Sequence, residues 1–454
     1  MYNQKHLKMR IFFVTTLLLI ASIGSAQETT IENNETVPTV WTLQDCINYA
    51  IQHNITVKRA SLNKSIASLS YNQAKANKLP SVSSSFGQTF SNGNTIDPIT
   101  GDYVSDQIYS TNLGLNSSVT LFQGSQLKNQ IIQSGLMVEQ SAFLVEEAQN
   151  NIAVSILETY LQALYSKESV TIAENNLKAS EAEVERAKSR LDAGTVALNE
   201  YTEAKAQAAT NRYNIVAAQN NYEAYLFNLK QLLELDPSTS LELQEVDADI
   251  ETQFTTGNKF DAYQNAISTL PEIAASDLNI SIIEKDLAIA KGGYWPSISL
   301  SGSLGTGYTT VSDLRVGEQL NVNFNQKIGL SVNIPIFSKK QNKTAVETSK
   351  VNIEIALLER QTAEKEVYQK IETAWQNVVA SNEQITASKE ALEAATESYR
   401  LAKKKYELGA LSTTDLVISQ NTYTNAQQNY VQAKYLNILY NQLLQFYQGN
   451  EIKL

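Results

Sequence analysis

The chain has 454 residues and a formal net charge of −11, with 36 Lys and Arg against 47 Asp and Glu. This acidic balance excludes nucleic acid as a partner, because binding phosphates requires a basic face. A single cysteine, Cys46, and two histidines exclude an internal disulfide and a histidine-cluster metal site. So few histidines and cysteines also make Ser/His or Cys/His catalysis an unpromising reading. We therefore expect no metal, no cofactor and no enzyme activity.

Residues 1–26 have the features of a secretory signal peptide. The basic start consists of Lys5, Lys8 and Arg10, and a short apolar run follows at 11–23. Gly24-Ser25-Ala26 is a small-residue cleavage site. Cleavage would leave 33 basic against 47 acidic residues, a net charge of −14. No later stretch approaches the ~18 apolar residues of a spanning helix, so the exported chain would enter a membrane only as a β-barrel. Residues 27–40 are expected to be flexible.

The remainder of the chain is one pattern written twice, about 215 residues apart. Leu-Pro-Ser-Val-Ser at 79–83 recurs as Trp-Pro-Ser-Ile-Ser at 295–299. Further matched pairs keep the same order: Leu62 with Leu278, Leu121 with Ile336, Gly194 with Gly409, Ala218 with Ala433 and Tyr225 with Tyr440. Such an order indicates two copies of one structural unit. We assign them to 41–235 and 262–454, joined by a linker at 236–261.

Each copy is predicted to contain a long helical hairpin. Between Ser125 and Asp236 there is no proline, and the only glycines are Gly135 and Gly194. Between Phe337 and Gln448, Gly409 is the only glycine and there is again no proline. A helix over 338–408, about 70 residues, would be roughly 105 Å long. We therefore place the tips of two antiparallel hairpins at Gly194 and Gly409.

The predicted helices carry a heptad repeat. One apolar row in the second copy is Ile371, Val378, Ile385, Leu392, Tyr399 and Tyr406, with a small-residue row at Ala374, Ser381, Ser388, Ala395 and Ala402. The first copy repeats the register from Ile156 to Leu191. Apolar residues every 3.5 positions form a coiled-coil seam, and the small row allows close approach of neighbouring helices.

Strands are predicted at 80–122 and 295–336, where apolar and polar residues alternate with a period of two. Each segment offers a hairpin of strands about ten residues or longer, suited to tilted transmembrane strands with lipid on one face and water on the other. Hairpin ends are expected at Asn92-Gly93-Asn94, Asp97-Pro98, Gly101-Asp102 and Gly317-Glu318. A periplasmic sheet with one buried face is the alternative.

Four strands cannot close a barrel, because about eight are needed for the smallest. An open sheet edge is not tolerated in hydrocarbon. If the strands span a membrane, the chain must therefore share its barrel with other copies of itself.

These elements, duplicated behind a signal peptide, resemble the TolC-type outer-membrane efflux factor family. The likeness covers about 41–449 and is carried by Leu-Gln-Asp-Cys-Ile at 43–47, Leu-Phe-Gln-Gly at 121–124, and Tyr-Glu-Leu-Gly at 406–409 with Asp415, Leu416 and Gln420. It implies a mainly α fold with β: long antiparallel coiled-coil helices forming an α-barrel, and four strands per subunit in a trimeric transmembrane β-barrel. The linker 236–261 would lie in an equatorial girdle.

The resemblance also implies a function and partners. The chain would be the outer-membrane channel of a tripartite efflux or type I secretion system, a passive homotrimeric duct with its helices in the periplasm. A membrane-fusion adaptor of an inner-membrane pump of the RND, ABC or MFS type would dock at the tips. Those tips are Ala193, Gly194 and Thr195 in the first copy and Leu408, Gly409 and Ala410 in the second. Exporters of drugs, metal ions, siderophores and proteins share this component.

Three residues near the tips are candidates for the entrance constriction. Asp415 and Glu200 each lie six residues past a tip glycine, so threefold repetition would form acidic rings that favour cations. Both could equally be solvated acids at helix starts. Tyr406 matches the family's gate tyrosine, although its heptad position also fits seam packing. Ile418 and Leu411 stand where the family has a further acid and base, so we expect packing, more than salt bridges, to hold the entrance shut.

The alternative functions are a periplasmic coiled-coil spacer and an envelope hydrolase. A periplasmic coiled-coil spacer conflicts with the four amphipathic strands. An envelope hydrolase lacks support, because the sequence has no Gly-x-Ser-x-Gly elbow, no histidine pair and no glycine-rich phosphate loop.

Overall fold

A computed structural model describes residues 40–96, 101–245 and 259–452. The predicted signal peptide, nearly all of the segment 27–40, Asp97-Pro98 and half of the linker 236–261 lie outside these residues.

The helices occur as two matched sets. The first copy contains α2 (Leu43–His53), α3 (Ile55–Ala76), α4 (Gln126–Asp192) and α5 (Leu198–Leu233), of 11, 22, 67 and 36 residues. The second contains α6 (Lys259–Thr269), α7 (Pro271–Gly292), α9 (Gln341–Glu407) and α10 (Thr413–Tyr447), of 11, 22, 67 and 35 residues. The predicted duplication and fold class are confirmed.

Local sequence explains where these helices begin. Thr42 and Asp45 form a capping box at the start of α2, and the Asn54 side chain accepts a hydrogen bond from Thr56 N at the start of α3. Pro271 occupies the first turn of α7, where its missing N–H costs nothing. Along α9 the heptad residues Ile371 and Val378 are buried, which confirms the predicted seam.

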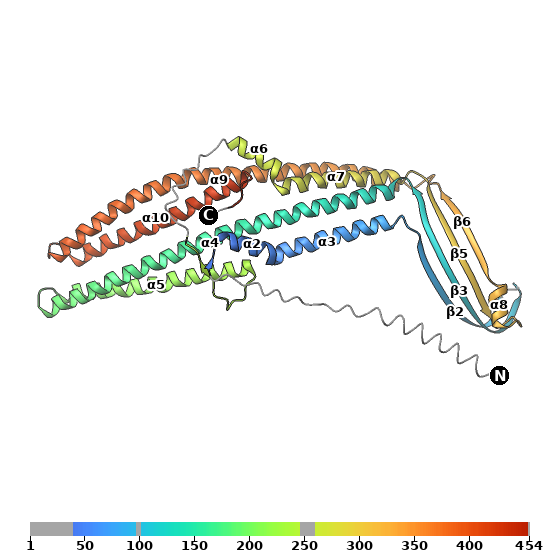
Figure 1. Cartoon of the computed structure of the whole chain (residues 1–454), viewed down its shortest axis with the longest axis horizontal. Helices are drawn as coiled ribbons and strands as arrows, with labels where there is room; N and C mark the ends of the chain where they lie inside the picture. The colour runs from blue at the N-terminus through green and yellow to red at the C-terminus, as the bar shows by residue number, and fades with distance from the viewer. Residues whose placement is uncertain (1–39, 97–100, 246–258, 453–454) are drawn as a thin grey trace. The chain divides into compact units, whose positions relative to one another are not determined.

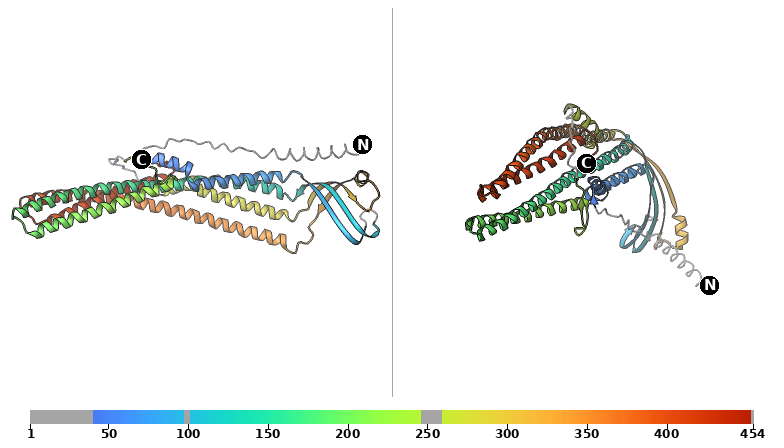
Figure 2. Two further views of the ribbon diagram at one scale, coloured as in Figure 1. Left: turned by 90° about the horizontal axis from the view of Figure 1, so that it is seen from below. Right: turned by 60° about the vertical axis from the view of Figure 1, so that its left-hand side comes forward.

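The four long strands form one antiparallel sheet in the order β2-β3-β5-β6. They are β2 (Ser81–Ile96), β3 (Tyr103–Gln123), β5 (Ser297–Thr309) and β6 (Asn325–Asn333). Strand β3 of the first copy pairs with β5 of the second, and a bulge interrupts this ladder between Thr120 and Phe122. The sheet is a single curved layer (Figure 2).

One predicted hairpin end is wrong, and another lies in the predicted connection, between β5 and β6, but is helical and not a loop. Asn92-Gly93-Asn94 lies inside β2, paired with β3 residues, because the ladder continues to Ile96. Gly317-Glu318 lies in a short helix, α8 (Val316–Val322). The buried Gln319 side chain explains this helix: its Nε2 donates to Leu314 O at 2.8 Å and Thr309 O at 3.0 Å, while its Oε1 accepts from Thr309 N at 2.9 Å.

Each strand continues into a helix, so strands and helices share one lateral order. Beside the sheet, α3 packs on α4, α4 on α7 and α7 on α9, matching β2-β3-β5-β6 (Figure 1). Toward the tips the order becomes α5-α4-α10-α9. Within the described residues, β2 with α3 therefore forms one lateral edge of the sheet half and β6 with α9 forms the other.

The main core lies at mid-length, where α2, α4, α5 and α10 meet. Trp41, Ile156, Tyr160 and Leu229 are all at most 1 % exposed there. A two-residue parallel pair, β1 (Val40–Trp41) with β4 (Glu242–Leu243), lies against this core, and the Tyr160 hydroxyl donates to Gln244 O at 2.8 Å. This arrangement fixes the segment before α2 to the segment after α5.

Candidate functional site

The two hairpin tips have the same backbone geometry. Gly194 and Gly409 have φ of 69° and 74°, the left-handed region that favours glycine. Thr195 N donates to Arg190 O at 2.9 Å, and Ala410 N donates to Lys405 O at 2.9 Å. These six-to-one bonds are Schellman motifs, which end α4 and α9 and turn the chain into the return helices.

The tip residues lie at the surface of the chain. Ala193, Gly194 and Thr195 are exposed, as are Gly409 and Ala410, and Leu408 is 84 % exposed. A Cβ built on either glycine would meet no atom within 4 Å. The tips are thus two small-residue turns with free space around them, and Leu408 adds an apolar side chain to that surface.

The two candidate acids differ in their surroundings. Asp415 lies in the first turn of α10, where its backbone N–H donates to Ser412 Oγ at 3.1 Å and its Oδ2 accepts from the same hydroxyl at 2.7 Å. It therefore helps to start the helix, while its side chain stays exposed. Glu200 is half-buried and accepts from Thr413 Oγ1 at 3.4 Å.

Polar contacts join the two hairpins near their tips. Besides the Thr413–Glu200 bond, Thr414 Oγ1 donates to Glu203 Oε2 at 3.0 Å. Arg186 Nη1 of α4 lies 3.6 Å from Glu407 Oε1 of α9 and 3.0 Å from Glu183 Oε1. Burial raises the pKa of the Glu183 carboxyl, and Arg186 acts to lower it. An ion pair therefore crosses between the hairpins, at residues that the sequence analysis did not single out.

Tyr406 is 1 % exposed, so within the single chain it is a seam residue. Its ring lies under the Arg190 guanidinium, 5.6 Å from ring centroid to Cζ. Among the described residues, its buried hydroxyl has no hydrogen-bond partner. The structure thus brings Tyr406, Glu200 and Asp415 to the same end of the hairpins, but only Asp415 among them is exposed.

The sheet has two chemically opposite faces. The pairing register puts large apolar residues on one face: Val82, Phe86, Phe90, Leu113, Leu115, Leu300, Leu304, Ile328, Leu330 and Val332. The other face carries small polar residues and one lysine: Ser81, Ser83, Ser85, Asn116, Ser118, Ser299, Ser301, Ser303, Asn325, Lys327 and Ser331. The apolar residues are exposed, for example Phe86 at 68 % and Ile328 at 87 %. An exposed apolar surface of this extent marks a membrane or partner contact.

No metal centre is present in the described part of the chain, where no three His, Cys, Asp or Glu side chains are grouped to hold an ion. Across the same residues, no helix is both long enough and apolar enough to cross a bilayer.

Known proteins resemble this chain in both sequence and fold. A profile of the outer membrane efflux protein family matches residues 46–234 and 262–448. The chain belongs to this family. The two matched segments correspond to the two structural copies and are separated by the linker.

Individual relatives are distant in sequence but similar in fold. Outer membrane efflux protein BepC of Brucella suis is 23% identical over 270 residues, which are 58% of this chain and 55% of that protein. Toxin and drug export protein A of Aggregatibacter actinomycetemcomitans is 22% identical over 96% of this chain and 95% of that protein. The CmeC outer membrane channel of Campylobacter jejuni superposes with a TM-score of 0.76 at 18% identity, over 90% and 85% of the two chains. The chain is thus an outer-membrane efflux protein.

Proposed function

We propose that this chain assembles into a homotrimer and forms a passive export duct without catalytic activity. In this arrangement the sheets close into one transmembrane barrel, and the helical hairpins continue the duct into the periplasm. The observation that carries the proposal is the pair of open lateral edges formed by β2 with α3 and by β6 with α9.

Both sheet edges are unpaired in the single chain. Each terminal strand, β2 and β6, has one hydrogen-bonded neighbour within the described residues. Unpaired backbone groups cost several kcal/mol each in hydrocarbon, so β6 must pair with β2 of another copy. On β5, Ile298 and Tyr308 share the apolar face and are ten residues apart, about 33 Å. At a tilt of about 40° this covers the roughly 25 Å apolar band of an outer-membrane barrel.

The helices that adjoin these edges are also unpartnered. On α3, Leu62, Ile66 and Leu69 are 65 %, 61 % and 68 % exposed. On α9, Val351, Ile355 and Leu358 are 53 %, 48 % and 61 % exposed. Both stripes begin within about three turns of the end of their helix that adjoins the sheet, so they would meet when β6 of one copy pairs with β2 of the next. Three copies supply twelve strands, and the number three follows the family resemblance.

The partners and cargo extend this proposal. The exposed tip turns support docking of a periplasmic adaptor, which would connect the duct to an inner-membrane pump of the RND, ABC or MFS type. The cargo would be selected mainly by the pump. The name of the Aggregatibacter relative gives toxins and drugs as what that protein exports, and these are one such cargo class.

The trimer is tested by disrupting the α3 stripe. Leu62→Glu combined with Ile66→Glu puts charges where we expect the neighbouring α9 to pack, so native mass spectrometry in detergent should show monomers in place of trimers. Lys64→Glu, on the opposite side of α3, is the matched control and should leave trimers intact. Wild-type monomers that conduct ions in bilayers, or stripe variants that remain trimeric, would refute the proposal.

A further inference from the structure

The junction between sheet and helices has a charge opposite to that of the chain. Windows of 15 to 18 residues around the four strand–helix connections, 70–84, 117–133, 287–303 and 329–346, contain no Asp or Glu. They contain seven lysines, which we call the lysine collar: Lys75, Lys78, Lys128, Lys291, Lys339, Lys340 and Lys343. In a chain with a net charge of −11, this concentration of one sign at one level points to an anionic partner.

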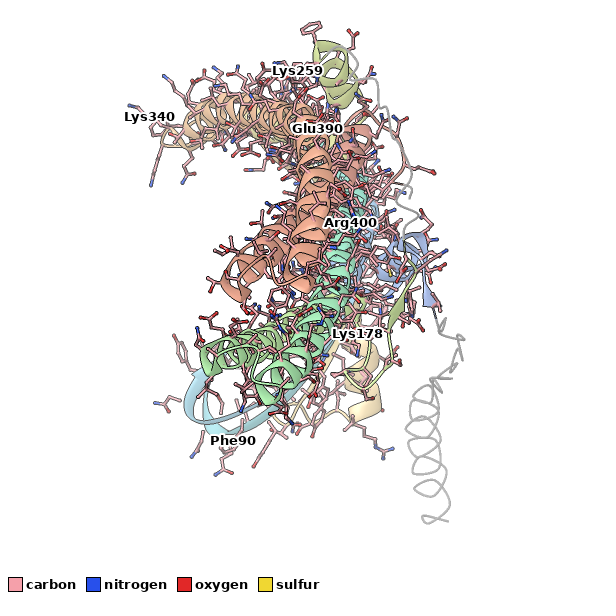
Figure 3. All side chains as sticks on the ribbon, turned by 90° about the vertical axis from the view of Figure 1, so that its left-hand side faces the viewer. Phe90, Lys178, Lys259, Lys340, Glu390 and Arg400 are labelled. Carbon is pink, nitrogen blue, oxygen red and sulfur yellow. The ribbon has the colours of Figure 1, made fainter. Side chains whose placement is uncertain are left out.

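The collar charges have no carboxylate partner, and one of them, the Lys75 ammonium, lies 3.8 Å from the centroid of the Tyr71 ring. All seven lysines are exposed, and none forms an ion pair with the residues that the structure describes. Elsewhere in the described chain, Lys259, Lys350 and Lys370 each bind a carboxylate, whereas other exposed lysines, such as Lys178 and Lys389, also form no ion pair. Lys340 lies at the end of α9, away from the packed helices (Figure 3). The collar therefore has no internal counter-ion.

The backbone gives no reason for lysine at two of these positions. Lys339 and Lys340 have φ of 50° and 66°, a region that disfavours any residue with a Cβ. At the equivalent junction of the first copy the same turn is made by Gly124 and Ser125, with φ of 55° and 63°. Lys339 is therefore costlier than Gly124, whereas Lys340 and Ser125 both carry a Cβ, so the backbone does not select lysine at either position.

A hollow of about 380 Å³ at the junction combines collar charge with apolar surface. Lys78 and Lys128 lie on its rim, and Val119, Leu121 and Phe122 of β3 line its wall. At the same junction Tyr294 and Trp295 are 52 % and 64 % exposed. Amphipathic aromatic rings beside lysines are typical of the level where a bilayer meets water. The hollow thus offers cations to a headgroup and apolar side chains to an acyl chain.

We propose that the lysine collar binds the anionic headgroups of phospholipids in the periplasmic leaflet. The inference rests on the proposed function, which places the apolar face of the sheet in lipid and the helices in the periplasm. The collar lies on the helical side of the sheet and therefore at the periplasmic leaflet. Phosphates of that leaflet supply the missing counter-ions, and acyl chains cover Leu121 and Phe122.

The test uses the full-length chain in nanodiscs of phosphatidylethanolamine with or without phosphatidylglycerol. The collar variant carries Lys78→Gln, Lys128→Gln and Lys340→Gln. The control carries the same charge loss on the helical hairpins, at Lys178, Lys188 and Lys389, which are also exposed. Lipid retained after detergent extraction is counted by mass spectrometry. Wild type and control should retain phosphatidylglycerol preferentially, and the collar variant should retain roughly tenfold less, because each lysine near an anionic surface strengthens binding.

Three outcomes would overturn the inference. They are equal retention of both lipids by wild type, unchanged retention by the collar variant, and full displacement of phosphatidylglycerol by inorganic phosphate, which would indicate a phosphate site only. Trimer mass and conductance are measured in the same samples. If wild type forms a conducting trimer but shows no lipid preference, only the proposal that the collar binds anionic lipid is refuted. If wild type forms no trimer and does not conduct, the proposed function is refuted.

Discussion

The sheet and the hairpin tips differ in how far their exposed groups are satisfied within the single chain. At the sheet, two edges are unpaired within the described residues and a broad apolar face is exposed, and lysines lie where the strands join the helices. At the tips, backbone groups are satisfied within the chain by Schellman bonds, and the exposed groups are mainly small residues, with Leu408 and Asp415 beside them. This difference fits the proposal that the sheet makes permanent contacts with lipid and other copies, whereas the tips bind an adaptor reversibly.

The tips provide the sharpest test of this contrast. Replacing Gly194 and Gly409 by Trp fills the open space where we expect the adaptor. Adaptor affinity should fall by roughly tenfold or more, since a clash of more than about 1.4 kcal/mol suffices. Drug susceptibility of cells carrying the double variant should approach that of a deletion strain, while trimer yield stays normal.

Backbone strain must be separated from bulk in this experiment. Any residue with a Cβ costs about 1–2 kcal/mol at these φ values, but Asn tolerates them best. The double Asn variant is therefore the control and should keep most efflux. Wild-type efflux from the Trp variant at normal membrane levels would show that the tips are not the docking surface.

Two single charges, Asp415 near the tips and Lys327 on the polar face of the sheet, predict opposed effects on ion selectivity. Asp415→Asn removes three carboxylates from the proposed entrance of a trimer and should lower cation preference in planar bilayers. Lys327→Gln removes three ammonium groups from the polar face of the sheet and should raise it. Both effects should shrink at 1 M salt, where the screening length is about 3 Å.

Reversal potentials in asymmetric salt distinguish these outcomes. If Asp415→Asn left selectivity unchanged at low salt, Asp415 would be only the helix-start residue that its bonds to Ser412 already make it. A shift of the same sign for both variants would mean that Lys327 does not face the conducting lumen.

How much the sequence predicted depends on the range of the interactions. The ends of α4 and α9 followed from a lack of breakers and from Gly194 and Gly409, which are local signals. The faces of the sheet followed from a period of two. Helix α8 was not predicted, because it depends on four hydrogen bonds of the buried Gln319 side chain to backbone groups of Thr309, Ser312 and Leu314, and no sequence period marks such contacts.

The candidate site divides in the same way. Asp415 and the tip glycines are local features, and the structure places them as exposed groups at one end. The Arg186–Glu407 pair joins residues 221 positions apart in α4 and α9, so no spacing rule predicts it. The spacing of Glu183 and Arg186, three residues apart on one helix face, was the one available signal.

Arg186 gives the smallest expected effect. Its pair with Glu407 is partly exposed, with side chains 36 % and 44 % accessible, so it contributes at most about 1 kcal/mol to holding the hairpins together. Arg186→Gln should leave trimer stability nearly unchanged and increase hydrogen exchange of residues 183–190 and 403–410. Glu407→Gln is the matched variant, because it removes the pair but leaves Arg186 beside Glu183.

The pH dependence separates the two variants. Burial raises the pKa of the Glu183 carboxyl in the folded state. Such a carboxyl destabilises the fold when it is ionised, at a pH above its folded-state pKa. This destabilisation is lost as the pH falls through that pKa. Arg186→Gln removes a group that lowers this pKa, so the pKa should rise further. On acidification, hydrogen exchange at the tips should therefore fall more steeply in Arg186→Gln than in Glu407→Gln. The Glu407→Gln variant loses a charge that raises the pKa of Glu183. Identical pH profiles for both variants would show that Arg186 acts on Glu407 alone and not on Glu183.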